Sequence, residues 1–258
     1  MTRVQRLLAP IAWGILFLAV WETFVRVRDI KPFLLPAPSA IWKSLRKNHS
    51  LILNAAKATG SNAVIGLLVG ACLGVLVALF AQRFSIIRAL ITPISAAFNT
   101  MPIVALGPVF YNLFGPTSDG ARRVVVALVA FFPVFVNTLK GLTQVEPVHE
   151  ELMRSYASGE SAFLRLVRLP NALPFALTGL RVAASLSVIA AVVVEYFGGL
   201  QNGLGSRVAN AVKLSQTPKA WAYIVSAILM GLSFYVAGLA LERLVMPWQA
   251  RRRSGNSA

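Results

Sequence analysis

The sequence predicts an all-α, polytopic membrane protein with about six transmembrane helices. Of its 258 residues, 57% are hydrophobic and only 13% are charged, whereas soluble domains carry about 25% charged residues. The apolar residues fall in long continuous runs, and roughly 20 such residues cross the hydrocarbon core of a bilayer. Strands of a membrane barrel would instead alternate apolar and polar residues over about ten positions. The runs therefore favour helices.

Six apolar runs are long enough to span a membrane, and they predict a single transmembrane domain over 1–258. The second run is uncharged and repeats glycine at helical spacing (Gly60, Gly66, Gly70 and Gly74), which lets neighbouring helices approach closely. The third run is uncharged but interrupted by three prolines. The predicted spans are 9–25, 61–81, 89–114, 122–140, 172–195 and 220–241.

Two features near the N-terminus are informative. The first run lacks a small-x-small cleavage site before Glu22, so it predicts a retained span rather than a signal peptide. After it, Pro38 and Ser39 can start a short amphipathic helix that places Ile41, Trp42 and Leu45 on one face.

Charge and cysteine content exclude several classes of protein. The net charge is +16, but the basic residues lie mostly between apolar runs, which favours lipid headgroups over nucleic acid as their partners. They are divided evenly between the two sides of the predicted topology, so charge does not decide the orientation. A single cysteine, Cys72, excludes a disulfide framework, and with only two histidines a protein-built metal site is not expected.

No motif for nucleotide binding or hydrolysis occurs in the chain. The Gly-x4-Gly-Lys-Ser/Thr phosphate loop is missing, as are His-Glu-x-x-His and Gly-x-Ser-x-Gly. Three ionisable residues of the spans (Glu22, Glu195 and Glu242) lie near span ends, and only Arg181 lies deeper. A buried proton relay is therefore not indicated, and the energy source is expected outside this chain. An ATP-independent secondary transporter or a membrane enzyme remains the alternative.

A charged segment interrupts the apolar chain at 150–174, EELMRSYASGESAFLRLVRLPNALP. Leu152, Tyr156, Phe163 and Val167 share one helical stripe. Ser158-Gly159 is a plausible turn, and prolines end the second half at Leu169-Pro170. The pattern predicts a helix–turn–helix with an apolar stripe, which serves either as a docking element on the membrane surface or as an ordinary interfacial hairpin.

This segment resembles the EAA loop of binding-protein-dependent ABC importer permeases. Glu151 stands at the position of the family's Glu, Val167 at its aliphatic position, and Leu169-Pro170 at its Leu-Pro. The two alanines are replaced by Leu152 and Met153, and Ala157 stands at the family's glycine. Other segments resemble the nitrate/sulfonate/taurine-type permeases, in order over almost the whole chain: LPAPSAIWKSL, FNTMPIVALGPVFYNLFG, FFPVFVNTLKGL and LPNALPFALTGLRVAASLSVIAAVVVEYFGG.

The resemblance implies a type I ABC importer permease fold and a division of labour. The chain would form the substrate pathway in the inner membrane, as a homodimer with a second copy. Two ATP-binding subunits would bind ATP and magnesium, with no cofactor in this chain, and an extracytoplasmic binding protein would deliver the substrate. The coupling loop, about 146–170, and both termini would be cytoplasmic. The substrate would be a small nutrient, either a sulfonate-like organic anion or a heterocyclic pyrimidine or vitamin precursor.

Two sets of residues follow from the resemblance. In the first, Glu151 is expected to make a polar contact to the ATPase, and Tyr156 and Phe163 an apolar one; each could instead pack against the permease's own helices. The ATPase-coupling set is Glu151, Leu152, Arg154, Tyr156, Ala157, Gly159, Phe163, Val167, Leu169 and Pro170.

The second set is expected along the substrate pathway. The polar stretch in the third span could equally be a simple kink, and the serines of the fifth span could bond back to their own helix. Glu195 could gate the outer end or cap the helix. This set is Asn99, Thr100, Met101, Pro102, Ser185, Ser187 and Glu195.

Overall fold

The computed structural model describes residues 3–84, 86–87, 89–90, 93, 97, 103–115 and 117–247. Throughout these residues the regular structure is helical, without strands, which confirms the all-α prediction. Within the described part of the chain, five helices are long and apolar enough to cross a membrane: Leu8–Val27, His49–Ala81, Gly120–Thr143, Glu160–Phe197 and Thr217–Val245. Most of the predicted span 89–114 lies outside the described residues.

The helices follow one another in a simple order along the chain. The predicted spans 9–25, 61–81, 122–140, 172–195 and 220–241 fall within α1, α3, α6, α9 and α11 respectively. The full order is α1 (Arg3–Val27), α2 (Pro38–Lys47), α3 (His49–Ala81), η1 (Ile103–Leu106), α5 (Gly107–Phe114), α6 (Gly120–Thr143), α7 (Pro147–Ser155), α8 (Glu160–Phe163), the π-helical segment η2 (Leu164–Arg168), α9 (Leu169–Phe197), α10 (Leu204–Lys213) and α11 (Thr217–Val245).

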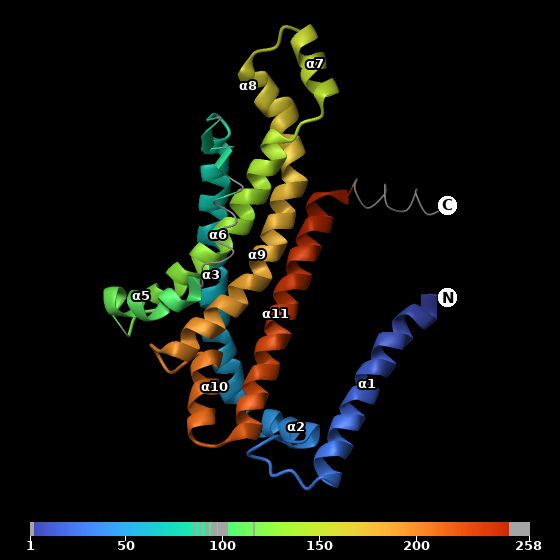
Figure 1. Ribbon diagram of the computed structural model, residues 1–258, viewed down its shortest axis with the longest axis vertical. Coiled ribbons are helices and arrows are strands. Elements are labelled where there is room, and N and C mark those ends of the chain that lie inside the picture. Colours follow the sequence, from blue (N-terminus) through green and yellow to red (C-terminus); the bar gives the residue numbers. More distant parts are fainter. Residues whose placement is uncertain are drawn as a thin grey trace.

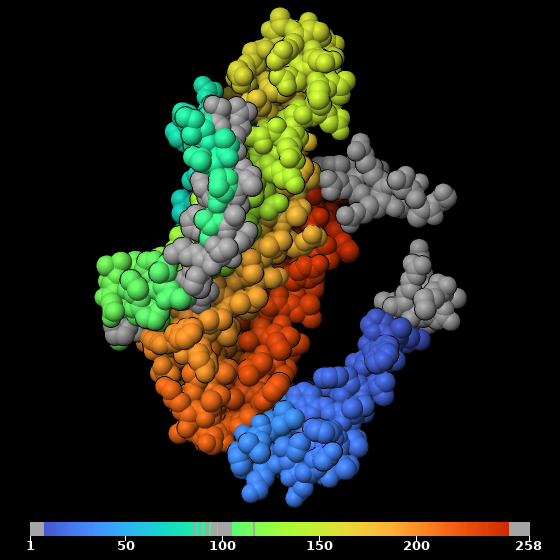
Figure 2. All heavy atoms as spheres, in the orientation of Figure 1, coloured from blue at the N-terminus to red at the C-terminus, as the bar shows by residue number. Residues whose placement is uncertain are grey.

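Four long helices, α3, α6, α9 and α11, run side by side and form the bundle (Figure 1). The α7–α8 hairpin projects from one end, which we call the hairpin end, and α2 and α10 lie at the opposite end, the far end (Figures 1 and 2). The start of α1 and the end of α11 both point towards the hairpin end. Helix α1 diverges from the bundle but touches it near the far end, where the rings of Trp21 and Trp221 lie 5.3 Å apart.

Glycine spacing sets the packing of α3 on α6, as the sequence predicts. A Cβ atom added at Gly70 would lie 2.9 Å from the Ala130 Cβ and even closer to the Ala127 carbonyl oxygen. A Cβ atom at Gly74 would lie 2.9 Å from a carbonyl oxygen of α6. The nearest atom to such a Cβ at Gly60 is instead the sulfur of Met230 in α11. The glycines therefore hold backbones in contact that side chains would separate.

Replacing Gly70 by alanine should destabilise the bundle by about 1–3 kcal/mol, because the added methyl group forces α3 away from α6. Unfolding by denaturing detergent in mixed micelles measures the loss. The matched control is Gly14→Ala in α1, where the added Cβ meets nothing within 4 Å and helix propensity alone would slightly favour the change. Equal stabilities for the two variants would contradict the close packing.

The amphipathic helix predicted after Pro38 is α2, which begins at that proline. Ile41 is buried and Leu45 packs into the cluster around Tyr223. The sequence placed Trp42 on the same face, but its side chain is exposed and the Arg46 guanidinium lies 5.1 Å from its ring centre. Only Ile41 and Leu45, which are four residues apart, face inward. Trp42 follows Ile41 directly, and successive side chains of a helix are rotated by about 100° around its axis.

Candidate functional site

The turn of the α7–α8 hairpin is built around Ala157. Helix α7 ends in a Schellman motif, in which the Ser158 amide donates to the Met153 carbonyl at 3.1 Å and the Ala157 amide to the Arg154 carbonyl at 2.9 Å. Ala157 has φ 48°, the left-handed conformation that favours glycine. This is the position at which the resembling family carries glycine. Gly159, by contrast, has an ordinary extended conformation before α8.

Replacing Ala157 by glycine should therefore stabilise the hairpin turn by about 0.5–1 kcal/mol, since glycine adopts this conformation without steric strain. Hydrogen exchange of the amides of 152–158 should slow accordingly. Ala162→Gly in α8 is the control and should have the opposite effect, because the backbone there is helical. Faster exchange in the Ala157→Gly variant would contradict the role of the turn.

The base of the hairpin is anchored to the bundle. The second half does not end at Leu169-Pro170 as predicted: α8, the π-helical turn η2 and α9 continue as one helix through Pro170. Pro170 lies in the first turn of α9, and the widened turn η2 just before Leu169 accommodates its missing donor. The side-chain amide of Asn171 donates to the carbonyls of Gly141 and Gln144, at 2.8 and 2.9 Å. A Cβ atom at Gly141 would lie 2.7 Å from the Ala172 Cα. The end of α6 and the start of α9 are thereby held in direct backbone contact.

An exposed apolar row lies along α7, in the hairpin that forms the tip of the molecule (Figure 2). Val148, Leu152 and Tyr156 follow one another at four-residue spacing and have exposed fractions of 61%, 51% and 75%. Phe163 was predicted with this row, but only 9% of it is exposed, and the Arg168 guanidinium lies 4.7 Å from its ring centre. Of the predicted apolar contacts, Tyr156 is thus available to a partner and Phe163 packs within the chain.

The remaining residues of the coupling set are spread over α7, the turn and the base of the hairpin. Glu151 is exposed, and none of the ion pairs among the described residues includes it. Arg154 pairs instead with Glu150, at 2.9 Å along α7. Val167 is half-buried, whereas Ala157, Gly159, Leu169 and Pro170 are exposed.

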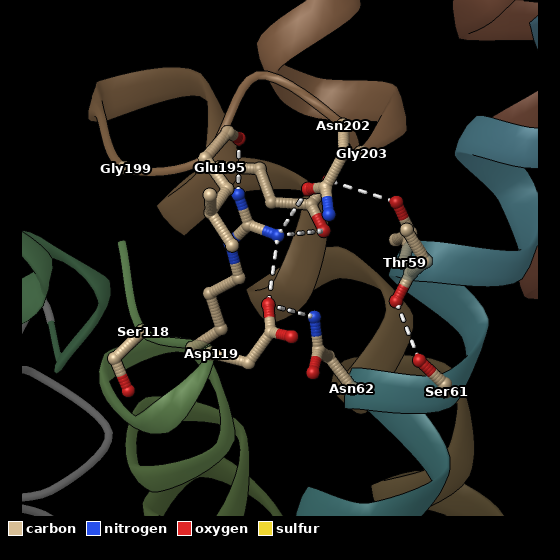
Figure 3. A network of polar contacts seen from close by, with 12 residues as sticks. Thr59, Ser61, Asn62, Ser118, Asp119, Glu195, Gly199, Asn202 and Gly203 are labelled. Carbon is tan, nitrogen blue, oxygen red and sulfur yellow. Dashed lines mark hydrogen bonds and ion pairs between the residues drawn. The ribbon is translucent and has the colours of Figure 1, made fainter. Parts of the chain in front are cut away.

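A second site, which is polar and buried, lies inside the far end of the bundle around Glu195 (Figure 3). Its carboxylate is completely buried and accepts hydrogen bonds from the Thr59 hydroxyl at 2.8 Å and the Gly205 amide at 3.1 Å. The Thr59 hydroxyl in turn accepts one from the Leu204 amide at 2.8 Å. A Cβ atom at Gly203 would collide with the same carboxylate. Glu195 and Thr59 therefore cap the start of α10.

Arg122 supplies the positive charge of this site and is also completely buried. One guanidinium nitrogen lies 3.9 Å from a Glu195 oxygen and donates to Asp119 at 3.1 Å and to Asn202 at 2.8 Å. The other terminal nitrogen donates to the Leu200 carbonyl. An unpaired buried charge costs several kcal/mol, so these partners make the burial of Arg122 possible.

The network extends to α3 and α5. The Asn62 amide donates to Asp119 at 3.0 Å and its oxygen accepts from Arg123 at 3.0 Å. The Tyr111 hydroxyl donates to the Val194 carbonyl at 3.3 Å, and its ring fills the space beside Gly199, whose φ is 80°. The buried polar network therefore joins α3, α5, α6, α9 and the start of α10.

Sequence reasoning missed this network. The sequence predicts that basic residues such as Arg122 flank the apolar runs, and that Glu195 lies near a span end where a side chain can reach the headgroups. Both side chains instead point into the protein, where their opposite charges lie 3.9 Å apart. The available signal was the glycine-rich stretch after Glu195, since glycines there leave room for the carboxylate.

The other predicted pathway residues are only partly described. Asn99, Thr100, Met101 and Pro102 lie outside the described residues. Ser187 is buried and its hydroxyl donates to the Ala183 carbonyl of its own helix at 2.8 Å. Ser185 is half-buried. These serines and Glu195 lie on α9, but the structure brings only Glu195 into a polar cluster.

Two further charges meet between α9 and α11. Arg181 and Glu242 form an ion pair at 2.9 Å, and both are partly buried. Glu242 thus supplies the opposite charge for Arg181, the charged residue that the sequence places deepest within a span. Among the described residues, no group of three or more His, Cys, Asp or Glu side chains could hold a metal ion.

A known protein family matches most of the chain. Residues 70–248, more than half of the chain, match the family described as binding-protein-dependent transport system inner membrane component. The chain belongs to this family. It is therefore a multi-pass inner-membrane permease subunit of a binding-protein-dependent importer, with a role in transport rather than catalysis. The matched region contains the hairpin and all of the far-end network except Thr59 and Asn62.

Curated relatives match over nearly the whole chain. The formylaminopyrimidine transport permease protein ThiX of Halalkalibacterium halodurans is 30% identical over 98% of this chain and 100% of its own length. The riboflavin transport system permease protein RibX of Chloroflexus aurantiacus is 28% identical, with 91% and 88% covered. The putative aliphatic sulfonates transport permease protein SsuC of Bacillus subtilis is 27% identical, with 90% and 84% covered.

A solved structure supports the fold. The crystal structure of an amino acid ABC transporter with histidines superposes with a TM-score of 0.62 at 18% identity, covering 78% of this chain and 96% of the matched chain. The permease subunit therefore has the type I importer permease fold that the sequence predicted.

Proposed function

We propose that this permease subunit couples its substrate pathway to separate ATPase subunits through the α7–α8 hairpin. The observation that carries the proposal is the exposed row of Val148, Leu152 and Tyr156 at the tip of a hairpin that projects beyond the bundle. An apolar row flanked by charges suits a groove on a partner protein. ATP and magnesium would bind to that partner, and this chain would need no cofactor of its own.

The hairpin base provides a route for coupling. Asn171 ties α9 to the end of α6, and Gly141 and Gly179 keep these helices in backbone contact. A movement imposed on the hairpin would therefore displace α6 and α9 together. ATPase closure would bias the permease between inward-open and outward-open states, provided that the ATPase binds the two states with different affinity.

The coupling proposal implies an orientation and a set of partners. The hairpin end, towards which the start of α1 and the end of α11 point, would face the cytoplasm and two ATP-binding subunits, with both termini on that side. The far end would face an extracytoplasmic substrate-binding protein. A second copy of the permease would complete the pathway in a homodimer, with membrane lipid around it and no nucleic acid.

For the substrate we propose a small heterocyclic nutrient of the pyrimidine or vitamin-precursor class. Support comes from the printed substrates of two relatives, a formylaminopyrimidine and riboflavin. A sulfonate-like organic anion is the alternative, which the sulfonate permease favours. Calorimetric screening of the associated binding protein with both classes distinguishes them, since tight binding of a sulfonate alone would refute the heterocycle.

Purification of the permease from its native membrane tests the coupling proposal. We expect a phosphate-loop ATPase to copurify, and the reconstituted complex to accumulate substrate only when ATP is present on the hairpin side. Substrate uptake by the permease alone, driven by a proton gradient, would contradict the proposal and support an ATP-independent secondary transporter.

A further inference from the structure

Cations at the far end of the bundle exceed the carboxylates that could pair with them. Glu22 is paired with Arg26 at 2.6 Å, Asp119 with Arg122 at 3.1 Å, and Glu195 is buried. Asp29, just after α1, is the remaining carboxylate of this end among the described residues; it is exposed and belongs to none of the ion pairs there. None of the ion pairs among the described residues uses a lysine. The lysines of this end therefore remain available to carboxylates of another molecule.

Three of these lysines surround one hollow. It has a volume of about 640 Å³ and lies between α2 and the turn that joins α10 to α11. Lys43 and Lys47 project from successive turns of α2, and Lys219 comes from the start of α11. Ser44, Asn48 and Gln216 add polar groups to the lining, and no carboxylate is among the residues that line it.

Packing and a hydrogen bond fix the position of α2 relative to the start of α11, the two elements that carry the lysines. Ile41 of α2 is buried, and Leu45 packs on the cluster that contains Ala222 and Tyr223 of α11. The Thr217 hydroxyl donates to the Phe33 carbonyl at 2.8 Å, which ties the start of α11 to the segment before α2. The three amines are thus presented by elements whose relative position is fixed before any partner arrives.

We propose that this lysine hollow receives carboxylate side chains of the extracytoplasmic binding protein. The inference rests on the proposed function, which places the far end outside the cytoplasm. Each exposed ion pair contributes little to the affinity, because water and salt screen the two charges. The three amines would therefore act mainly by attracting and orienting an acidic surface, an effect that falls as salt is added.

The position of the hollow favours a protein over lipid headgroups. Helix α2 lies across the end of the bundle, together with the α10–α11 turn, rather than along the apolar sides of α3 and α11 (Figure 1). A partner that approaches along the bundle axis meets this surface first. Lipid headgroups are the competing occupant, and the experiment separates the two.

Charge reversal at the hollow tests the proposal. Lys43→Glu, Lys47→Glu and Lys219→Glu are combined in one variant, and Lys31→Glu, Lys57→Glu and Lys213→Glu in a control with the same change in net charge. All three control lysines are exposed and none lines the hollow. Each permease is assembled with its ATPase in phosphatidylcholine nanodiscs, and ATP hydrolysis is followed as the binding protein is added.

We expect the hollow variant to need at least ten times more binding protein for half-maximal stimulation, at an unchanged maximal rate. The control should shift less than threefold, and added salt should reduce the difference between the two. Zero-length carbodiimide crosslinking of the unaltered complex should join Lys43, Lys47 or Lys219 to acidic residues of the binding protein.

Three results would count against the inference in different ways. Equal shifts in both variants, with no crosslink at the three lysines, would overturn the docking assignment alone. If stimulation of ATP hydrolysis differs between the hollow variant and the control only when anionic lipid is added to the nanodiscs, the hollow binds lipid headgroups instead. No stimulation of the unaltered complex by the binding protein would contradict the proposed function itself.

Discussion

Replacing Arg122 by methionine should lower the free energy of unfolding by about 3–5 kcal/mol, because it leaves Glu195 buried without its opposite charge. The Leu200 carbonyl and the Asn202 side chain would also lose their donor. Unfolding of the purified permease by denaturing detergent in mixed micelles measures the change.

Arg123→Met is the matched control for this prediction. Arg123 is the neighbouring residue, but its side chain is 43% exposed, pairs with Asp119 at 3.8 Å and donates to the Asn62 side chain at 3.0 Å. Its loss should therefore cost about 1–2 kcal/mol, less than the loss of Arg122. Adding Glu195→Gln to Arg122→Met should restore part of the stability, because the uncompensated charge is removed. A loss equal to that of the control would show that the buried network does not stabilise the far end.

Truncating both Leu152 and Tyr156 to alanine should weaken ATPase binding at least about 30-fold, corresponding to about 2 kcal/mol or more for residues at the centre of an interface. The apolar row would be lost, while α7 would keep good helix formers. Purified complexes in nanodiscs, titrated with the ATPase, give the affinity, and uptake should fall in parallel.

Glu150→Ala serves as the control on the same helix. Glu150 is exposed and pairs with Arg154 away from the apolar row, so its replacement should change the affinity less than threefold. If the double variant and the control bind the ATPase equally well, the row is not the docking surface, even if the hairpin contacts the ATPase elsewhere.

Periodic features of the fold could be predicted from the sequence. Apolar runs located the long helices, since a membrane span needs about 20 apolar residues. Glycine spacing predicted the close approach of α3, which Gly70 and Gly74 make against α6. The helix–turn–helix of the hairpin followed from its apolar stripe and its Ser-Gly break, but the predicted end at Leu169-Pro170 was wrong, because the helix continues through Pro170 into α9.

Tertiary contacts could not be predicted in the same way. Arg122 and Glu195 belong to different helices, and nothing in either local sequence indicates that they meet. The sequence placed the hairpin break at Ser158-Gly159, which falls within the observed turn at 156–159. The residue that adopts the left-handed conformation in this turn is Ala157, because the Schellman hydrogen bonds fix the end of α7 there. Phe163 shares the helical stripe of Tyr156, but Arg168 covers it from within the hairpin.

Crosslinking from the hairpin tip tests the central claim most directly. Tyr156→Cys in a Cys72→Ala background places one thiol on the exposed row, and a short thiol-to-amine reagent is added to the assembled, transporting complex. The proposed coupling predicts a product between residue 156 and the ATPase, and none from a control Lys213→Cys at the far end. An intact, active complex that yields no product at residue 156, or that joins the ATPase at residue 213, would contradict it.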